Sequence, residues 1–232
     1  MKTVNQLVVE MEFDPTSKFL AVGTSDSAIK VYDALKGFQT HSFNGHRGLI
    51  LGLKFFPTAD SLKLLSTAED FTIKVWDLVL KKDVAVMKPK SKEDGQGHRT
   101  TSMLFTTDNK TLITAGLDGC IHFWNVVDNF KLVSSISASS LGALRYEEIM
   151  TMVYLNLKDD PCLLLGGHSG YVSVFSIKKQ KIVFTCCESS TVGAAGAQER
   201  YEAELAEAST SAQIQVMEYI KERFAIIIVN GD

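Results

Sequence analysis

Apolar and polar residues alternate along the chain in short runs that turn-forming residues separate. Runs such as AIKVYD and TIKVWD place β-branched residues at every second position, a pattern that is typical of half-buried β-strands. The segments DPTSK, TSDS and TTDNK between such runs are rich in residues that favour tight turns. In one stretch the pattern predicts strands at 49–55, 63–66, 72–77 and 83–87. We therefore expect an all-β protein.

One such pattern occurs four times. The copies are TSDSAIKVYD (24–33), TAEDFTIKVWD (67–77), AGLDGCIHFWN (115–125) and GGHSGYVSVFS (166–176). The equivalent aromatic residues are 44, 48 and 51 residues apart in sequence, and they are Tyr32, Trp76, Trp124 and Phe175. Self-similarity at such a period is typical of repeat proteins, in which each repeat is one small unit that packs on its neighbours.

Two of the four units share a set of polar side chains. In each, a glycine–histidine pair comes first and a hydroxyl residue follows, with an aspartate four residues and a tryptophan ten residues after that hydroxyl residue. The first set is His46, Ser66, Asp70 and Trp76, and the second is His98, Thr114, Asp118 and Trp124. The first and fourth units lack the complete set, and we expect apolar packing to hold them. Their residues at these positions are Val22 and Tyr32 in one, and Leu165, Ser169 and Phe175 in the other.

A histidine, a serine and an aspartate together also suggest a hydrolase triad. The set recurs in two units, however, whereas an enzyme requires one site, and no G-x-S-x-G motif is present in the sequence. The four cysteines lack the paired spacing of a metal site, and we interpret them as reduced thiols of an intracellular protein; they are Cys120, Cys162, Cys186 and Cys187. We predict a structural role for the polar sets, and neither a catalytic residue, a cofactor nor a metal.

A Gly-His pair before and a Trp-Asp pair after short strands, at a period of about 40–45 residues, resemble the WD-repeat β-propeller. The resemblance implies that the indole N–H donates to the hydroxyl, the hydroxyl to the imidazole and the imidazole to the aspartate. It assigns the whole chain, 1–232, to one propeller domain with insertions at 88–97 and 188–211. The predicted blades are 4–44, 45–96, 97–140, 146–187 and a partial fifth at 212–232.

A seven-bladed propeller at this period would require about 300 residues. We therefore expect the chain to be a fragment of a longer propeller, with an apolar face on its first unit that no neighbouring blade covers. The residues that cannot all face one neighbour are Val8, Met11, Phe13, Phe19, Val22 and Ile29. Such a face predicts self-association of the isolated chain.

The first part of the chain is more specific than the general repeat. Residues FDPTS (13–17), THSFNGH (40–46) and LLSTAEDFTIKVWDL (64–78) resemble the transducin beta-like protein 3 family. The resemblance covers residues 8 to 186 and implies a non-catalytic scaffold of the nucleolar small-subunit processome that supports pre-18S rRNA processing. The implied partners are other WD-repeat proteins and, indirectly, the U3 snoRNP and pre-rRNA, without a membrane or a small-molecule substrate.

Another kind of WD-repeat adaptor is the alternative, such as a ubiquitin-ligase substrate receptor or a histone-tail reader. An acidic central pocket with aromatic walls would favour it, and the turns of this sequence show no such cluster. The net charge of −3 and the pI of about 6.0 exclude a chain that is basic throughout and clamps nucleic acid electrostatically. No apolar run reaches the roughly 20 residues of a membrane helix, and the N-terminus lacks the features of a signal peptide.

Two groups of residues are candidate contacts. Within the lysine-rich stretch 80–99, the candidate RNA or acidic-partner contacts are Lys88, Lys90 and Lys92. A solvated loop is the alternative, because Glu93 and Asp94 offset part of the charge and no aromatic residue is interleaved for base stacking. Tight turns and Gly-His loops share one rim of a propeller, where mixed polar side chains suit protein contacts. The predicted rim contacts are Arg47, Glu69, Arg99, Leu117 and His168.

Overall fold

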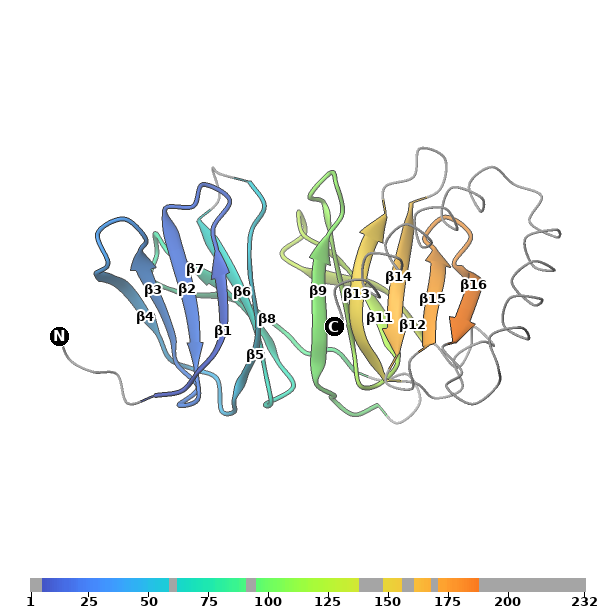
Figure 1. The fold of residues 1–232 in the computed structure, drawn as a ribbon, viewed down its shortest axis with the longest axis horizontal. Helices are drawn as coiled ribbons and strands as arrows, with labels where there is room; N and C mark the ends of the chain where they lie inside the picture. The colour runs from blue at the N-terminus through green and yellow to red at the C-terminus, as the bar shows by residue number, and fades with distance from the viewer. Residues whose placement is uncertain are drawn as a thin grey trace, which may run out of the picture.

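The chain folds into four separate four-stranded antiparallel sheets (Figure 1). The structure, a computed structural model, describes residues 6–58, 62–90, 95–137, 148–155, 161–167 and 171–187. Each sheet is made of four strands that are consecutive in sequence and joined by hairpins, so each sheet is one blade. The predicted all-β architecture with four complete blades is confirmed. The predicted partial fifth blade and the insertion at 188–211 lie outside the described residues.

The strands of each blade follow one another at short intervals. The first blade consists of β1 (Val8–Phe13), β2 (Phe19–Thr24), β3 (Ile29–Asp33) and β4 (Gln39–Phe43). The second consists of β5 (Ile50–Phe55), β6 (Lys63–Ala68), β7 (Ile73–Asp77) and β8 (Lys82–Met87). The third consists of β9 (Thr100–Phe105), β10 (Thr111–Gly116), β11 (Cys120–Asn125) and β12 (Lys131–Ser137). The fourth consists of β13 (Ile149–Leu155), β14 (Cys162–Gly167), β15 (Tyr171–Ser176) and β16 (Lys181–Cys187).

Strand boundaries in the second blade differ from the predicted ranges by one or two residues. Strand β6 continues to Ala68 because Ala68 still pairs with Ile50, and Thr67 still pairs with Ile73. Strand β8 begins at Lys82, which pairs with Asp77 across the turn. Turn residues mark the approximate end of a strand, whereas pairing with both neighbours decides its last residue.

The blades stack through their faces, and the first strand of each blade contacts the first strand of the next. In β6, neighbouring side chains pack alternately on the two faces of the sheet, so a middle blade is buried on both sides. Leu64 belongs to an apolar cluster with residues of the first blade, and Leu65 belongs to a cluster with residues of the third. A third cluster joins the third and fourth blades around Ile113 and Phe175. Successive side chains of a strand point to opposite faces, so each middle strand supplies two cores.

The first blade has an uncovered apolar strip along β1. Val8, Met11 and Phe13 are 47, 57 and 54% exposed, as expected for a face that no described blade covers. Val22 and Ile29 are buried instead, and Ile29 packs in the cluster between the first and second blades. The uncovered face is therefore narrower than the sequence predicts.

Among the described residues, no helix is long or apolar enough to cross a membrane.

Candidate functional site

The first polar set meets at the edge of the second blade. Trp76 Nε1 donates to Ser66 Oγ at 2.7 Å, Ser66 Oγ lies 2.7 Å from His46 Nε2, and His46 Nδ1 lies 3.0 Å from an Asp70 carboxylate oxygen. An ionised carboxylate only accepts hydrogen bonds, so the Nδ1 atom carries the imidazole proton. Nε2 is then an acceptor, and it receives the Ser66 hydroxyl proton. The donors run in one direction from the indole to the carboxylate.

Asp70 also holds the backbone around it. It accepts the Arg47 N–H at 2.9 Å, the Thr72 N–H at 3.0 Å and the Thr72 hydroxyl at 2.7 Å. Burial by itself would raise the pKa of Asp70, but these donors and His46 outweigh burial and lower the pKa to about 2. Burial lowers the pKa of His46 although the hydrogen bond to Asp70 acts in the opposite direction. The lowered pKa keeps the imidazole neutral. The set is thus a carboxylate with a neutral histidine.

Gly45, which precedes His46, is required by the backbone and by space. Its φ of +150° lies in a region that side chains disfavour. A Cβ at this position would lie 3.3 Å from the Trp76 ring and 3.2 Å from Lys74 Nζ. The Gly-His pair of the repeat therefore allows the loop to pass directly over the tryptophan while the histidine turns inward.

The second set has a different arrangement. Trp124 Nε1 donates to Thr114 Oγ1 at 2.9 Å, as in the second blade. Asp118, however, lies 3.3 Å from His122 Nε2, and it accepts the Cys120 N–H at 3.0 Å. Burial would raise the pKa of Asp118, but the His122 hydrogen bond, the Cys120 N–H and electrostatic interactions with His122 and His98 together lower it.

His122 is a member of this set that the sequence analysis missed. It stands directly opposite Thr114 in the β10–β11 ladder, the place that Lys74 takes opposite Ser66 in the second blade. Its position two residues before the tryptophan was the available signal, because residues at this spacing share one face of a strand. In the third blade the side chain at this position reaches Asp118.

Three residues of this region have the side-chain types that zinc prefers. The ligand atoms of Asp118, Cys120 and His122 lie within 4.8 Å of one another, and His122 Nδ1 is buried without a hydrogen-bond partner in the structure. Both Asp118 oxygens already accept hydrogen bonds, from the Cys120 N–H and from His122. A structural zinc site requires four ligands, and the hydrogen bonds already account for the position of this carboxylate.

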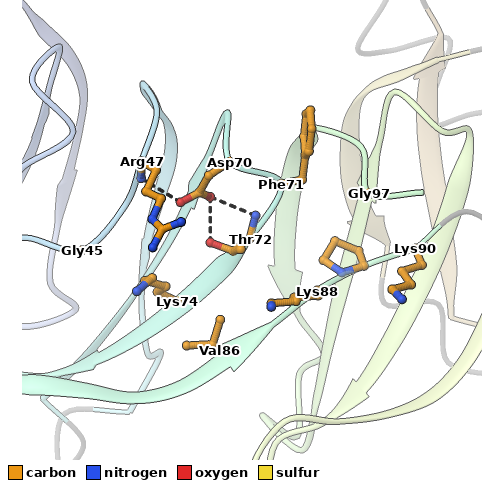
Figure 2. A pocket seen from close by; sticks show the side chains of 11 residues that line it. Gly45, Arg47, Asp70, Phe71, Thr72, Lys74, Val86, Lys88, Lys90 and Gly97 are labelled. Carbon is orange, nitrogen blue, oxygen red and sulfur yellow. Dashed lines mark hydrogen bonds between the residues drawn. The ribbon is translucent and has the colours of Figure 1, made fainter. Parts of the chain in front are cut away.

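A pocket of about 520 Å³ opens beside Asp70, between the second blade and the start of the third (Figure 2). The Gly-His loop, the β6–β7 turn, strands β7 and β8 and the segment after β8 contribute its walls. The lining residues are Gly45, Arg47, Asp70, Phe71, Thr72, Lys74, Val86, Lys88, Pro89, Lys90 and Gly97. Residues as far apart in sequence as 45 and 97 thus form one surface.

The pocket lining is strongly cationic. It has one arginine, three lysines and a single carboxylate, Asp70, whose oxygens take the donors described above. Lys74 Nζ lies 3.9 Å from an oxygen of Asp83, a partly exposed residue outside the pocket lining. Within the described part of the chain, no carboxylate forms an ion pair with the side chains of Arg47, Lys88 or Lys90. The described lining residues therefore carry excess positive charge, although the whole chain is slightly acidic.

The candidate contacts predicted from sequence have different surroundings. Arg47, Lys88 and Lys90 line the pocket. Glu69 and Arg99 form an ion pair at 2.8 Å across the junction of the second and third blades. Leu117 donates its N–H to the Arg99 carbonyl at 3.0 Å. Lys92 and His168 lie outside the described residues. Lys74 and Phe71, which the sequence pattern did not mark as contacts, also line the pocket.

Comparison with known proteins identifies the repeat. The family model described as "WD domain, G-beta repeat" matches residues 2–33, 37–77 and 90–125. Transducin beta-like protein 3 of Bos taurus is 34% identical over 119 residues, which are 51% of this chain and 14% of the relative. The Rattus norvegicus protein of that name is 28% identical over 181 residues, 77% of this chain and 22% of the relative.

Further relatives extend the comparison. Periodic tryptophan protein 2 homolog of Schizosaccharomyces pombe is 26% identical over 177 residues, 71% of this chain and 20% of the relative. The solved structure titled "Structure of U3-55K" superposes with a TM-score of 0.65 at 15% identity, over 80% of this chain and 53% of that chain. The chain spans between 14 and 22% of the length of the three sequence relatives. The repeats, the four blades and these matches together show that the chain is a WD-repeat β-propeller protein with homology to transducin beta-like protein 3.

Proposed function

We propose that the chain is a non-catalytic scaffold in ribosome biogenesis. In this role it binds other WD-repeat proteins of the small-subunit processome in the nucleolus and supports pre-18S rRNA processing together with the U3 snoRNP. The observation that carries the proposal is the similarity to transducin beta-like protein 3 over 77% of the chain. The similarity to a periodic tryptophan protein 2 homolog over 71% of the chain supports the same assignment.

The geometry of the polar set supports a scaffold rather than a hydrolase. Ser66 is completely buried, its hydroxyl accepts from Trp76, and it lies within hydrogen-bonding distance of His46. A nucleophilic serine must reach a substrate carbonyl, and this one is enclosed by the blade. The histidine, the hydroxyl and the indole instead connect a loop and two strands, which makes the rim beside them a rigid surface for binding.

Affinity purification tests this proposal. The tagged protein, expressed in cells of its own source at its natural level, is expected to retrieve other WD-repeat processome proteins and U3 RNA. Its depletion is expected to lower 18S rRNA while leaving the large-subunit RNA less affected. Retrieval of ubiquitin-ligase subunits or histones in place of processome proteins, with normal 18S rRNA after depletion, would contradict the proposal and favour another adaptor role.

A further inference from the structure

We propose that the pocket between the second and third blades is a receptor for a phosphorylated side chain of a partner protein. The inference rests on the proposed scaffold function and adds a binding site and a ligand class to it. It starts from two cations, Arg47 and Lys74, that line the same pocket. Figure 2 shows the guanidinium of Arg47 directed toward the ammonium of Lys74, on the side of the pocket below Asp70.

These two cations repel each other, and Asp70 is the single carboxylate among the four cations of the lining, so it balances only part of their charge. Asp83, which lies 3.9 Å from Lys74 Nζ, is a second, partly exposed counter-charge outside the lining. Asp70 already accepts hydrogen bonds from His46, from the Arg47 backbone and from Thr72. A bound anion with several oxygens would attract both cations and accept their free N–H donors. The exposed ammonium groups of Lys88 and Lys90 add to the positive potential at the entrance.

Lys74 distinguishes one class of anion from another. Its side chain is only 15% exposed, and its ammonium lies 5.4 Å from the centre of the Trp76 ring. An anion must therefore enter the pocket to reach it. A phosphate on the end of a side chain carries a charge of about −1.5 to −2 and three free oxygens, so it can enter. A phosphodiester in RNA has chain on both sides and is suited to the exposed lysines at the entrance instead.

The rest of the lining suits the peptide around a phosphorylated residue. Phe71 and Val86 are 44 and 45% exposed, and with Pro89 they form apolar wall segments next to the cations. The Phe71 backbone has a φ of +61°, and a Cβ on Gly97 would lie 3.0 Å from the Phe71 Cβ, so this aromatic side chain is closely supported. Phosphate recognition by basic clusters beside apolar contacts is a recurring mode of peptide binding.

A peptide-enrichment experiment tests the inference. The immobilised chain is incubated with an equimolar mixture of two degenerate peptide pools, one with a fixed central phosphoserine and one with serine. We expect the phosphoserine pool to be enriched by at least about tenfold among the bound peptides. Arg47→Gln and Lys74→Gln are each expected to reduce this enrichment by roughly tenfold. Lys36→Gln, which removes an exposed lysine outside the pocket, is expected to leave it unchanged.

Each outcome either supports the phosphate receptor or overturns it. Equal capture of the two pools overturns the proposal, and so does enrichment that persists in both pocket variants. In a parallel arm, tighter binding of a 12-nucleotide oligouridylate than of the phosphoserine pool, lost in the same variants, overturns it in favour of RNA. Thermal unfolding of Arg47→Gln checks that the fold persists, because Arg47 is exposed. If the chain shows no phosphoserine enrichment but still retrieves processome proteins, the phosphate receptor is contradicted and the proposed scaffold function is not.

Discussion

At the scale of the residue, Asp70 and Asp33 show how the same side chain differs between blades. Asp70 accepts hydrogen bonds from His46, from two backbone N–H groups and from the Thr72 hydroxyl. Among the residues that the structure describes, the Asp33 carboxylate accepts only the exposed N–H groups of Leu35 and Lys36. Removing a buried acceptor leaves its donors without partners, whereas water replaces an exposed one.

We therefore expect Asp70→Ala to lower the free energy of unfolding by about 1–3 kcal/mol. Asp33→Ala should lower it by less, since both of its donors can bind water. Urea denaturation of the two variants and the unmodified chain measures the difference. Equal midpoints for the two variants would show that the polar set contributes nothing beyond an ordinary turn.

Acid is expected to destabilise the second blade because it protonates Asp70 and His46. The pKa of Asp70 is about 2 against an ordinary 3.8, so the folded state favours its ionised form. This contribution to stability is complete well above pH 3.8 and is lost as the pH falls through that value toward 2. The pKa of His46 is also lowered, so protonation of this buried imidazole likewise opposes folding below pH 6.5.

Asp70→Asn separates the carboxylate from the other groups that titrate. Between about pH 5 and pH 2.5, the unmodified chain should lose about 1–2 kcal/mol more stability than the variant. Chemical denaturation at several pH values in this range provides the measurement. Parallel pH profiles for the two proteins would mean that the Asp70 carboxylate is not perturbed in the folded state.

At the scale of the element, the loop between β4 and β5 is fixed by a glycine. Gly45 combines a φ of +150° with close approach to Trp76 and Lys74. Gly37 has a φ of +70°, but no atom lies within 4 Å of a Cβ there. A side chain at Gly37 would meet backbone strain alone, whereas a side chain at Gly45 would meet both backbone strain and steric overlap. Comparing the two positions therefore isolates the effect of the overlap.

Gly45→Ala should lower the unfolding free energy by about 1–3 kcal/mol, the range for a strained backbone position. It should also move the His46 ring away from Ser66, because the loop must shift to make room for the methyl group. Gly37→Ala is the matched control and is expected to cost less. Thermal unfolding and the NMR signal of the Trp76 indole N–H report both effects; an unchanged indole signal in Gly45→Ala contradicts the packing argument.

At the scale of the whole molecule, the exposed strip on β1 is the feature with the clearest consequence. Met11 and Phe13 are two residues apart in a strand, so they share a face, and both are more than half exposed. Contiguous apolar surface on a folded domain favours association. Val127 is 78% exposed in the turn between β11 and β12 and serves as an isolated control.

We expect residues 1–232 alone to self-associate in a concentration-dependent manner. The double variant Met11→Glu, Phe13→Glu should shift the distribution toward the monomer, because charge on this face opposes its burial. Val127→Glu should have little effect. Sedimentation velocity at several concentrations decides between these outcomes, and a concentration-independent monomer of the unmodified chain would contradict the role of the strip.

The repeat by itself determined the four blades, because alternation and turn chemistry act over a few residues and recur in every unit. It also pointed to His46, Ser66, Asp70 and Trp76, since their offsets follow from one hairpin and the loop before it. Tertiary structure decided the contacts that reach beyond one hairpin. The pairing of β7 with β8 and the course of the segment after β8 bring Lys74 and Phe71 to the same pocket as Lys88. A sequence pattern indicates which face of a strand a residue occupies. The residues that it contacts on that face come from segments distant in sequence, so only the tertiary structure decides them.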